Sequence, residues 1–175
     1  FTAPPVRVTR KGVAPDDPAE GLAATIARAK SGAIDERVEA TERLMMWLAE
    51  SQHLAAKRLD YSAKPLDARV ASAALVKQFA DPDWQVRAHL AESLRWVVLE
   101  NDLAKAASGL LNDPHWLVRM LSLRAFADHH GAKFDKVAAY YATSDADPLV
   151  RGMAAALRQR WTTTQPASRP AAATE

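Results

Sequence analysis

Hydrophobic residues between Pro18 and Trp161 recur at intervals of three and four, the spacing that places them on one face of an α-helix. Asp17 suits the N-cap of a first helix, Pro18 suits its first position, and Gly32 ends it. A second helix is predicted from near Asp35. Six more are predicted over 66–80, 85–99, 102–112, 117–129, 133–143 and 149–161. Because no run alternates with a period of two, we predict an all-α fold.

Three segments depart from this pattern. Residues 1–16 combine prolines with Arg7 and Arg10, so we expect an extended basic arm, which is also a candidate partner contact. Residues 51–64 break the rhythm of the helices and are interpreted as an insertion. Residues 162–175 are small, polar and contain proline, which is typical of a disordered tail or a linker.

A short motif occurs three times at equal intervals, as DPDWQVR at 81–87, DPHWLVR at 113–119 and DADPLVR at 145–151. A fixed period of about 20–50 residues indicates stacked supersecondary units that bury their apolar faces against one another. The Asp side chain can accept N–H groups of the turn, and Pro sets φ where it follows that Asp. The valines in the motif, Val86, Val118 and Val150, are predicted to point inward.

The order of helix, Asp-containing turn, Val-Arg and helix resembles the HEAT repeats of the armadillo-like α-solenoids. The resemblance covers three repeats over 65–161, with 17–64 as degenerate N-terminal capping helices. It implies a right-handed α-α superhelix and a ladder of polar contacts between adjacent repeats. In that ladder Asp81, Asp113 and Asp145 would meet Arg87, Arg119 and Arg151. The segment ERVEATERL departs from the pattern, because its Val38 follows Arg37 instead of preceding it.

Composition leaves the class of partner open. The 175 residues are 49% hydrophobic and 25% charged, which suits one globular domain, and the net charge of +2 does not by itself indicate nucleic acid. The chain lacks cysteine, which excludes disulfides and thiolate metal sites. No apolar run is long enough to cross a bilayer, so no membrane span is predicted. Residue 1 is Phe. Either the chain is a processed mature protein, as an extracytoplasmic location would require, or it is a piece of a longer one; its compartment stays undetermined.

The titratable residues do not form a recognisable catalytic pattern. The adjacent His129 and His130 would point about 100° apart on a helix end, which disfavours joint ligation of a metal. Some HEAT-like hydroxylases hold iron with His-Glu pairs, and this chain contains no such pair. No phosphate-binding glycine loop is present either. We therefore predict no enzymatic activity, no cofactor and no metal.

Equivalent positions in successive copies of the motif predict an apolar surface suited to a protein partner in a multi-subunit complex. This surface includes Leu117, Leu121, Leu149 and Met153, although a register shift of one residue would instead bury some of them between repeats. Four other residues are predicted to contribute to partner binding: Trp84, Trp116, His89 and Arg124. The alternative is nucleic acid, because HEAT-like base-excision DNA glycosylases grip a duplex with Trp, Asp and Arg. The ladder role expected for Arg87 and Arg119 weakens that alternative, as does packing of the two Trp rings on the turns.

Overall fold

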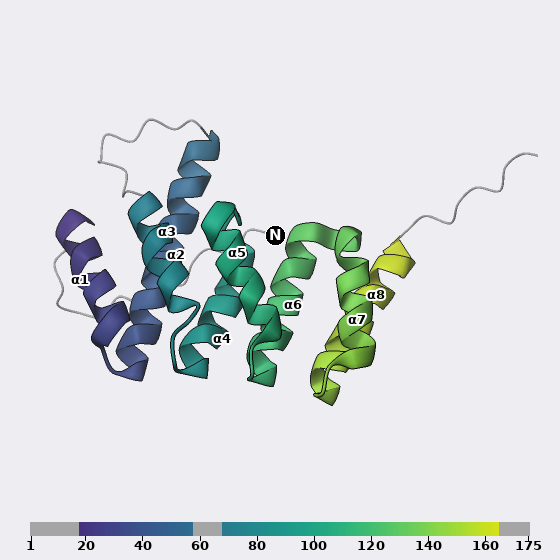
Figure 1. Cartoon of the computed structure of the whole chain (residues 1–175). Helices are drawn as coiled ribbons and strands as arrows, with labels where there is room; N and C mark the ends of the chain where they lie inside the picture. Colours follow the sequence, from purple (N-terminus) through teal and green to yellow (C-terminus); the bar gives the residue numbers. More distant parts are fainter. Residues whose placement is uncertain (1–17, 58–67, 165–175) are drawn as a thin grey trace, which may run out of the picture.

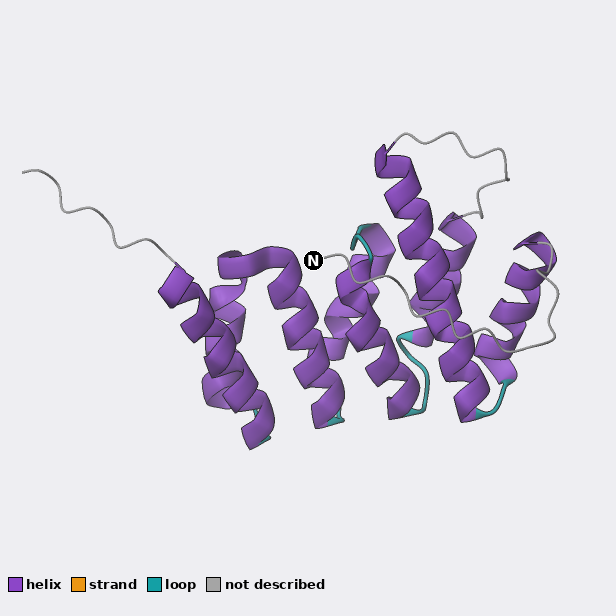
Figure 2. Cartoon of the chain, turned by 180° about the vertical axis from the view of Figure 1, so that it is seen from behind, coloured by secondary structure: helices purple, strands orange, loops and turns teal. Residues whose placement is uncertain are grey.

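The fold is described by a computed structural model, which covers residues 18–57 and 68–164. The described residues are helical, without strands (Figures 1 and 2). The α-helices are α1 (Pro18–Ser31), α2 (Ile34–Lys57), α3 (Ala68–Gln78), α4 (Trp84–Ser93), α5 (Asn101–Gly109), α6 (Trp116–His130), α7 (Asp135–Ser144) and α8 (Pro148–Thr164). Three short 3-10 helices are η1 (Leu94–Trp96), η2 (Leu110–Asn112) and η3 (Gly131–Phe134).

The helices form two layers. In one layer α2 contacts α4, α4 contacts α6, and α6 contacts α8; in the other, α1 contacts α3 and α3 contacts α5. Figure 1 shows the pairs following one another from α1 to α8, with the tight turns that join each pair along the lower edge. In Figure 2 the layer of α2, α4, α6 and α8 lies toward the viewer. Equivalent parts of successive pairs therefore lie side by side, which is a repeat-like arrangement.

The core lies between these two layers and continues from α1 to α8. Its fully buried side chains include one leucine from each of several helices: Leu44, Leu75, Leu90, Leu94 and Leu123. Each such side chain contributes about 1.5–3 kcal/mol relative to an exposed one. Val86, Val118 and Val150 are 0% exposed, which confirms the prediction that the valine of each motif points inward.

The predicted helix over 85–99 is too long. Helix α4 ends at Ser93, η1 follows, and Val97 has an extended backbone with φ −117° and ψ 149°. The side chain of Gln52 replaces the missing helical hydrogen bonds: its Oε1 accepts the N–H of Val98 at 2.7 Å, and its Nε2 donates to the Val98 carbonyl at 3.0 Å. Gln52 lies in the segment interpreted as an insertion, but residues 51–57 continue helix α2.

Two other predicted boundaries change. The tail was expected to begin at residue 162, yet α8 continues through Thr164. Thr162 and Thr163 donate side-chain hydrogen bonds to the carbonyl of Gln159, which fits them into the last turn of the helix. The predicted arm at 1–16, the segment 58–64 and residues 165–175 lie outside the described residues.

Candidate interaction face and the ladder that forms it

The aspartate of each repeated motif organises its own turn. Oδ1 of Asp81 accepts the N–H of Asp83 at 2.8 Å. The same bond, also at 2.8 Å, joins Asp113 to His115 and Asp145 to Asp147. This is the local contact that favours Asp in turns. Because it recurs unchanged, the carboxylates are placed equivalently in all three turns.

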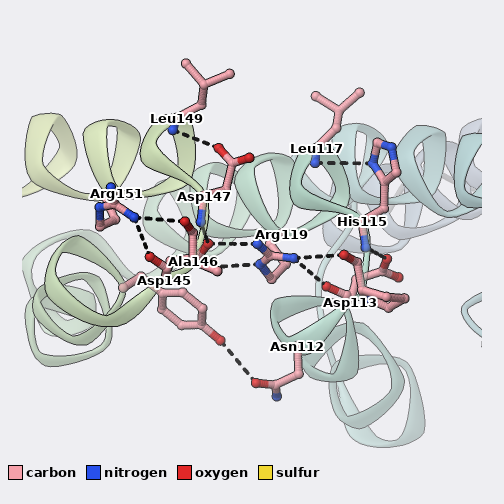
Figure 3. Close-up of polar contacts among 12 residues, drawn as sticks. Asn112, Asp113, His115, Leu117, Arg119, Asp145, Ala146, Asp147, Leu149 and Arg151 are labelled. Atoms are coloured by element: carbon pink, nitrogen blue, oxygen red, sulfur yellow. Dashed lines mark hydrogen bonds and ion pairs between the residues drawn. The ribbon is translucent and has the colours of Figure 1, made fainter.

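The arginine of each motif joins its repeat to the next. Arg87 donates from Nε and Nη2 to the carboxylate of Asp113 at 2.6 and 3.0 Å. Arg119 donates in the same way to Asp145 at 2.8 and 2.7 Å (Figure 3). Bidentate pairs of this kind combine charge with fixed geometry. These two pairs form a ladder between adjacent repeats, which runs from Arg87 and Arg119 to the Asp of the following repeat.

Within its own repeat each arginine contacts the backbone instead of the carboxylate. Nη1 of Arg87 donates to the carbonyl of Asp81 at 2.6 Å, and Nη1 of Arg119 donates to that of Asp113 at 2.8 Å. Arg151 makes the same bond to Asp145 at 2.7 Å. In the described part of the chain Arg151 has no carboxylate partner. The ladder therefore does not pair the Asp of a motif with the Arg of the same motif.

The ion pairs change the protonation equilibria of their members. The hydrogen bond from Arg119 lowers the pKa of Asp145, and the N–H of Asp147 acts in the same direction against the effect of burial. The hydrogen bond to Asp113 raises the pKa of Arg87, and that to Asp145 raises the pKa of Arg119. The side chains of Asp113 and Asp145 are each only 4% exposed, so both pairs are shielded from solvent.

Sequence reasoning missed the first member of the ladder, Arg37. Its Nε and Nη2 donate to the carboxylate of Asp81 at 3.0 and 3.2 Å, and its Nη1 donates to the carbonyl of Gly32 at 2.9 Å. Arg37 therefore corresponds to Arg87, although the interval between them is longer than the one that separates the three motifs. The order of Val and Arg in ERVEATERL pointed away from the repeat. The spacing of apolar residues after the arginine could have revealed it. Ala40 and Leu44 lie three and seven residues after Arg37, as the buried Leu90 and Leu94 do after Arg87.

The residue before each second helix is its N-cap. Oδ1 of Asp83 accepts the N–H of Gln85, and Oδ1 of Asp147 accepts that of Leu149, both at 2.8 Å. At the equivalent position, Nδ1 of His115 accepts the N–H of Leu117 at 3.3 Å (Figure 3). The side chain at this position therefore caps the helix that follows it. His115 also stacks on Trp84, with ring centroids 3.9 Å apart and planes 4° apart.

The ladder sets which side chains of α2, α4, α6 and α8 share an exposed surface, which we call the inner-layer face. Three rows of equivalent positions cross it: Asp35, Gln85, Leu117 and Leu149; Glu39, His89, Leu121 and Met153; and Glu42, Glu92, Arg124 and Ala156. Helix periodicity places the three positions of each helix, spaced by four and then three residues, on one side. His89 on α4 and Glu42 on α2 are in polar contact, with 2.8 Å between Nδ1 and Oε1.

A hollow of about 780 Å³ lies on this face, over α2, α4 and the start of α6. Its apolar lining comes from all three helices: Ile34, Val38, Trp84, Ala88, Leu117 and Leu121. Its polar lining is Asp35, Glu39, Glu42, Gln85, His89 and Glu92. Five residues of the lining lie on α4, and they include His89 and Trp84.

Four of the residues predicted to bind a partner thus line one hollow: Trp84, His89, Leu117 and Leu121. Leu149 is 56% exposed and Met153 is half-buried on the same layer, beyond the hollow. Arg124 is exposed, whereas Trp116 is half-buried and packs against the core. Arg7 and Arg10 lie outside the described residues.

Over residues 18–57 and 68–164, no three His, Asp or Glu side chains converge as metal ligands would. In the same ranges no helix has the length and the apolar composition needed to cross a bilayer. Comparison with protein-family models, with curated proteins and with solved structures finds no match for this chain. The function must therefore be inferred from the residues themselves.

Proposed function

We propose that this chain is an α-solenoid of the HEAT type, wound as a right-handed superhelix, that docks another protein on its inner-layer face and performs no chemistry. It acts as a docking subunit or an appended domain of a larger assembly. The observation that carries this proposal is the hollow of about 780 Å³ whose apolar lining comes from three consecutive helices of one layer.

Exposed apolar side chains on this layer support the proposal. Ile34 at the edge of the hollow is 41% exposed, and Trp84 is 37% exposed. Leu149 continues the apolar surface onto α8. Apolar side chains grouped on one face and bordered by polar residues are typical of protein interaction sites. Trp84 is also held in place by its stacking on His115, so it would lose little freedom on binding.

Nucleic acid is the second candidate, and the charges on the inner-layer face favour it less. Arg87 and Arg119 are engaged with Asp113 and Asp145, and Arg95 pairs with Glu92 at 2.7 Å. Among the described residues, the hollow itself is lined by four carboxylates and by no Lys or Arg. Phosphate binding would need cations at these places. Titration with duplex DNA over a salt series tests this alternative: weak binding without a steep salt dependence counts against it.

The docking proposal is tested by co-purification from the source cell extract with matched surface variants. Ile34→Gln removes an exposed apolar side chain beside the hollow, and Leu121→Gln removes a half-buried one from its lining. Val137→Gln, on α7 in the opposite layer, removes a side chain that is 36% exposed and serves as the control.

We expect specific proteins to be retained by the wild type and by Val137→Gln, and to be lost with Ile34→Gln. Loss of the co-purified proteins with Leu121→Gln supports the proposal only if the thermal unfolding of this variant matches that of the wild type. Ile34 is exposed enough to be replaced without disturbing the core. Recovery of the same proteins with all variants, or of the wild-type chain alone as a monomer, would contradict the proposal.

A further inference from the structure

The charges that line the hollow have one sign. Asp35, Glu39 and Glu42 come from α2, Glu92 comes from α4, and no Lys or Arg of residues 18–57 and 68–164 takes part in the lining. The whole chain, by contrast, carries a net charge of +2. The acidic character of this surface is therefore local and does not reflect the overall composition.

Two of these carboxylates have partners and a third has a structural explanation. Glu42 pairs with His89, and Glu92 pairs with Arg95. Asp35 lies in the first turn of α2, where the helix dipole favours a negative charge. Glu39 has neither a partner nor a favourable place at the helix start, because it lies beyond the first turn and has no ion pair with any described residue. Arg43 is four residues further along the helix, but its guanidinium lies over the Trp47 ring at 5.6 Å.

The spacing of the acidic residues on α2 also disfavours the isolated helix. Asp35 and Glu39 are four residues apart, and Glu39 and Glu42 are three apart, so neighbouring carboxylates share one side. Like charges at these spacings destabilise a helix by a few tenths of a kcal/mol per pair. A cation supplied from outside the chain would remove this repulsion and would also satisfy Glu39.

The rows that cross the inner-layer face change character from one end to the other. The row that begins with Asp35 on α2 continues through Gln85 to Leu117 and Leu149. The row that begins with Glu39 continues through His89 to Leu121 and Met153. In these two rows the face is acidic over α2, polar over α4 and apolar over α6 and α8, whereas the third row runs from Glu42 and Glu92 to Arg124 and Ala156.

We propose that the occupant of the hollow is a segment of a partner protein with Lys or Arg at one end and apolar side chains at the other. Its cationic end lies over α2 and α4, and its apolar end lies over α6 and α8. This inference rests on the proposed docking function and adds the chemistry and direction of the partner. Four adjacent helices at axial distances of about 8–10 Å span about 24–30 Å, which a helical segment of about 16–20 residues would cover.

The opposite layer would not attract such a segment. A smaller hollow of about 330 Å³ between α1 and α3 has Lys30, Arg69 and Lys77 as the charged residues of its lining within the described part of the chain. Electrostatic complementarity therefore distinguishes the two faces and would orient the encounter.

Two synthetic peptides of about 18 residues, long enough to span the face as a helix, test the inference with the full chain. One has arginines in its first half and leucines in its second half, and the other has glutamate in place of every arginine. Affinity is measured by calorimetry at two salt concentrations. We expect the arginine peptide to bind at least about tenfold more tightly than its glutamate copy, and its affinity to fall as salt screens the charges.

Matched variants locate the contact. The double variant Asp35→Asn, Glu39→Gln should weaken binding of the arginine peptide by at least about fivefold. Glu50→Gln removes an exposed carboxylate of α2 that does not line the hollow, so it should leave the affinity unchanged. Equal binding of both peptides, or equal affinity of the double variant and Glu50→Gln, would overturn the inference. The docking proposal would survive that result if Ile34→Gln still loses the co-purified proteins.

The basic N-terminal residues of this chain are a competing occupant. Replacing Arg7, Arg10 and Lys11 by Glu in the full chain distinguishes the two sources of positive charge. An unchanged affinity for the arginine peptide supports a partner segment. A gain of about tenfold or more would mean that the chain's own residues compete for the hollow, and would overturn the assignment to a partner.

Discussion

The carboxylate of Asp145 serves two neighbours at once. It accepts the N–H of Asp147 within its own turn and two N–H groups of Arg119 from the preceding repeat (Figure 3). These bonds favour the charged form, and the pKa of Asp145 is accordingly lowered below its ordinary value of 3.8. A lowered pKa in the folded state means that the contribution of Asp145 to stability is present above about pH 4 and is lost as the pH falls through the folded-state pKa.

The pair between Asp145 and Arg119 is therefore expected to give a pH-dependent difference in stability. Asp145→Asn should lower the free energy of unfolding at pH 7 by up to about 3 kcal/mol, because Arg119 keeps its charge without a carboxylate. The difference from the wild type should shrink as the pH falls below about 4, because Asp145 is protonated first in the unfolded chain and, owing to its lowered pKa, only at lower pH in the folded chain. Denaturant unfolding at pH 7 and pH 3 measures both values. Asp128→Asn, at a more exposed carboxylate, is the control and should show little difference at either pH.

The hydroxyl of Thr41 is expected to reduce the stability of the fold. Its Oγ1 is buried without a hydrogen-bond partner among the described residues, whereas Oγ1 of the equally buried Thr25 donates to the carbonyl of Gly21 at 2.6 Å. Burying an unpaired hydroxyl costs about 1–3 kcal/mol. Thr41→Val should therefore raise the unfolding free energy by about 1 kcal/mol or more, and Thr25→Val should not. If urea midpoints show equal effects for the two variants, the hydroxyl of Thr41 has a partner after all.

At the scale of elements, Gly131 joins α6 to η3 and so sets the direction of the following helix, α7. It has φ 55° and ψ −140°, a conformation that residues with a Cβ rarely adopt. A Cβ at Gly131 would meet no atom within 4 Å, so any penalty for substitution arises from the backbone alone. Gly152 offers the opposite case, because it lies within α8 and also has open space around it.

Alanine substitutions at these two glycines should change stability in opposite directions. Gly131→Ala should lower the unfolding free energy by about 1–3 kcal/mol through backbone strain. Gly152→Ala should raise it by about 1 kcal/mol, because alanine favours the helix. Thermal and denaturant unfolding of the two variants provide the comparison. A stabilising Gly131→Ala would show that the turn between α6 and α7 does not need the left-handed backbone.

The sequence predicted the elements well where a single helix carries its own signals. The end of α1 just before Gly32, the repeated turns and the end of α6 at Gly131 all follow from local residue chemistry, whereas the predicted N-cap Asp17 lies outside the described residues. The sequence predicted the helix boundaries poorly where a distant side chain replaces backbone hydrogen bonds. Helix α4 ends at Ser93, and beyond η1 the side chain of Gln52 binds the backbone of Val98, a long-range contact that no local pattern contains.

The sequence likewise predicted one part of the candidate site and missed another. The constant interval between the motifs placed Leu117 and Leu121 on the predicted surface, and both line the hollow. It could not place α2, because Arg37 precedes Arg87 by a longer interval and the order of Val and Arg differs there. The acidic half of the hollow, with Glu39 and Glu42, was consequently missed. The packing of α2 against α4 and the contact between Arg37 and Asp81 show that α2 continues the layer.

At the scale of the whole molecule, one device repeated three times holds the layer together: Arg37 with Asp81, Arg87 with Asp113, and Arg119 with Asp145. The first of these pairs aligns α2 with α4, and the hollow lies over that junction. If α2 did not belong to the stack, neither the hollow nor its acidic lining would exist. The inner-layer face therefore depends on the three pairs being equivalent.

Double-mutant cycles on these three pairs test that dependence most directly. Each Arg and Asp is replaced by Ala singly and together, and the coupling energy is obtained from denaturant unfolding. The exposed pair Arg158 and Asp135 is the control. We predict three similar coupling energies of about 1–3 kcal/mol, each clearly larger than that of the control. Strong coupling in the two later pairs with none between Arg37 and Asp81 would contradict the account, because α2 would then lie outside the stack.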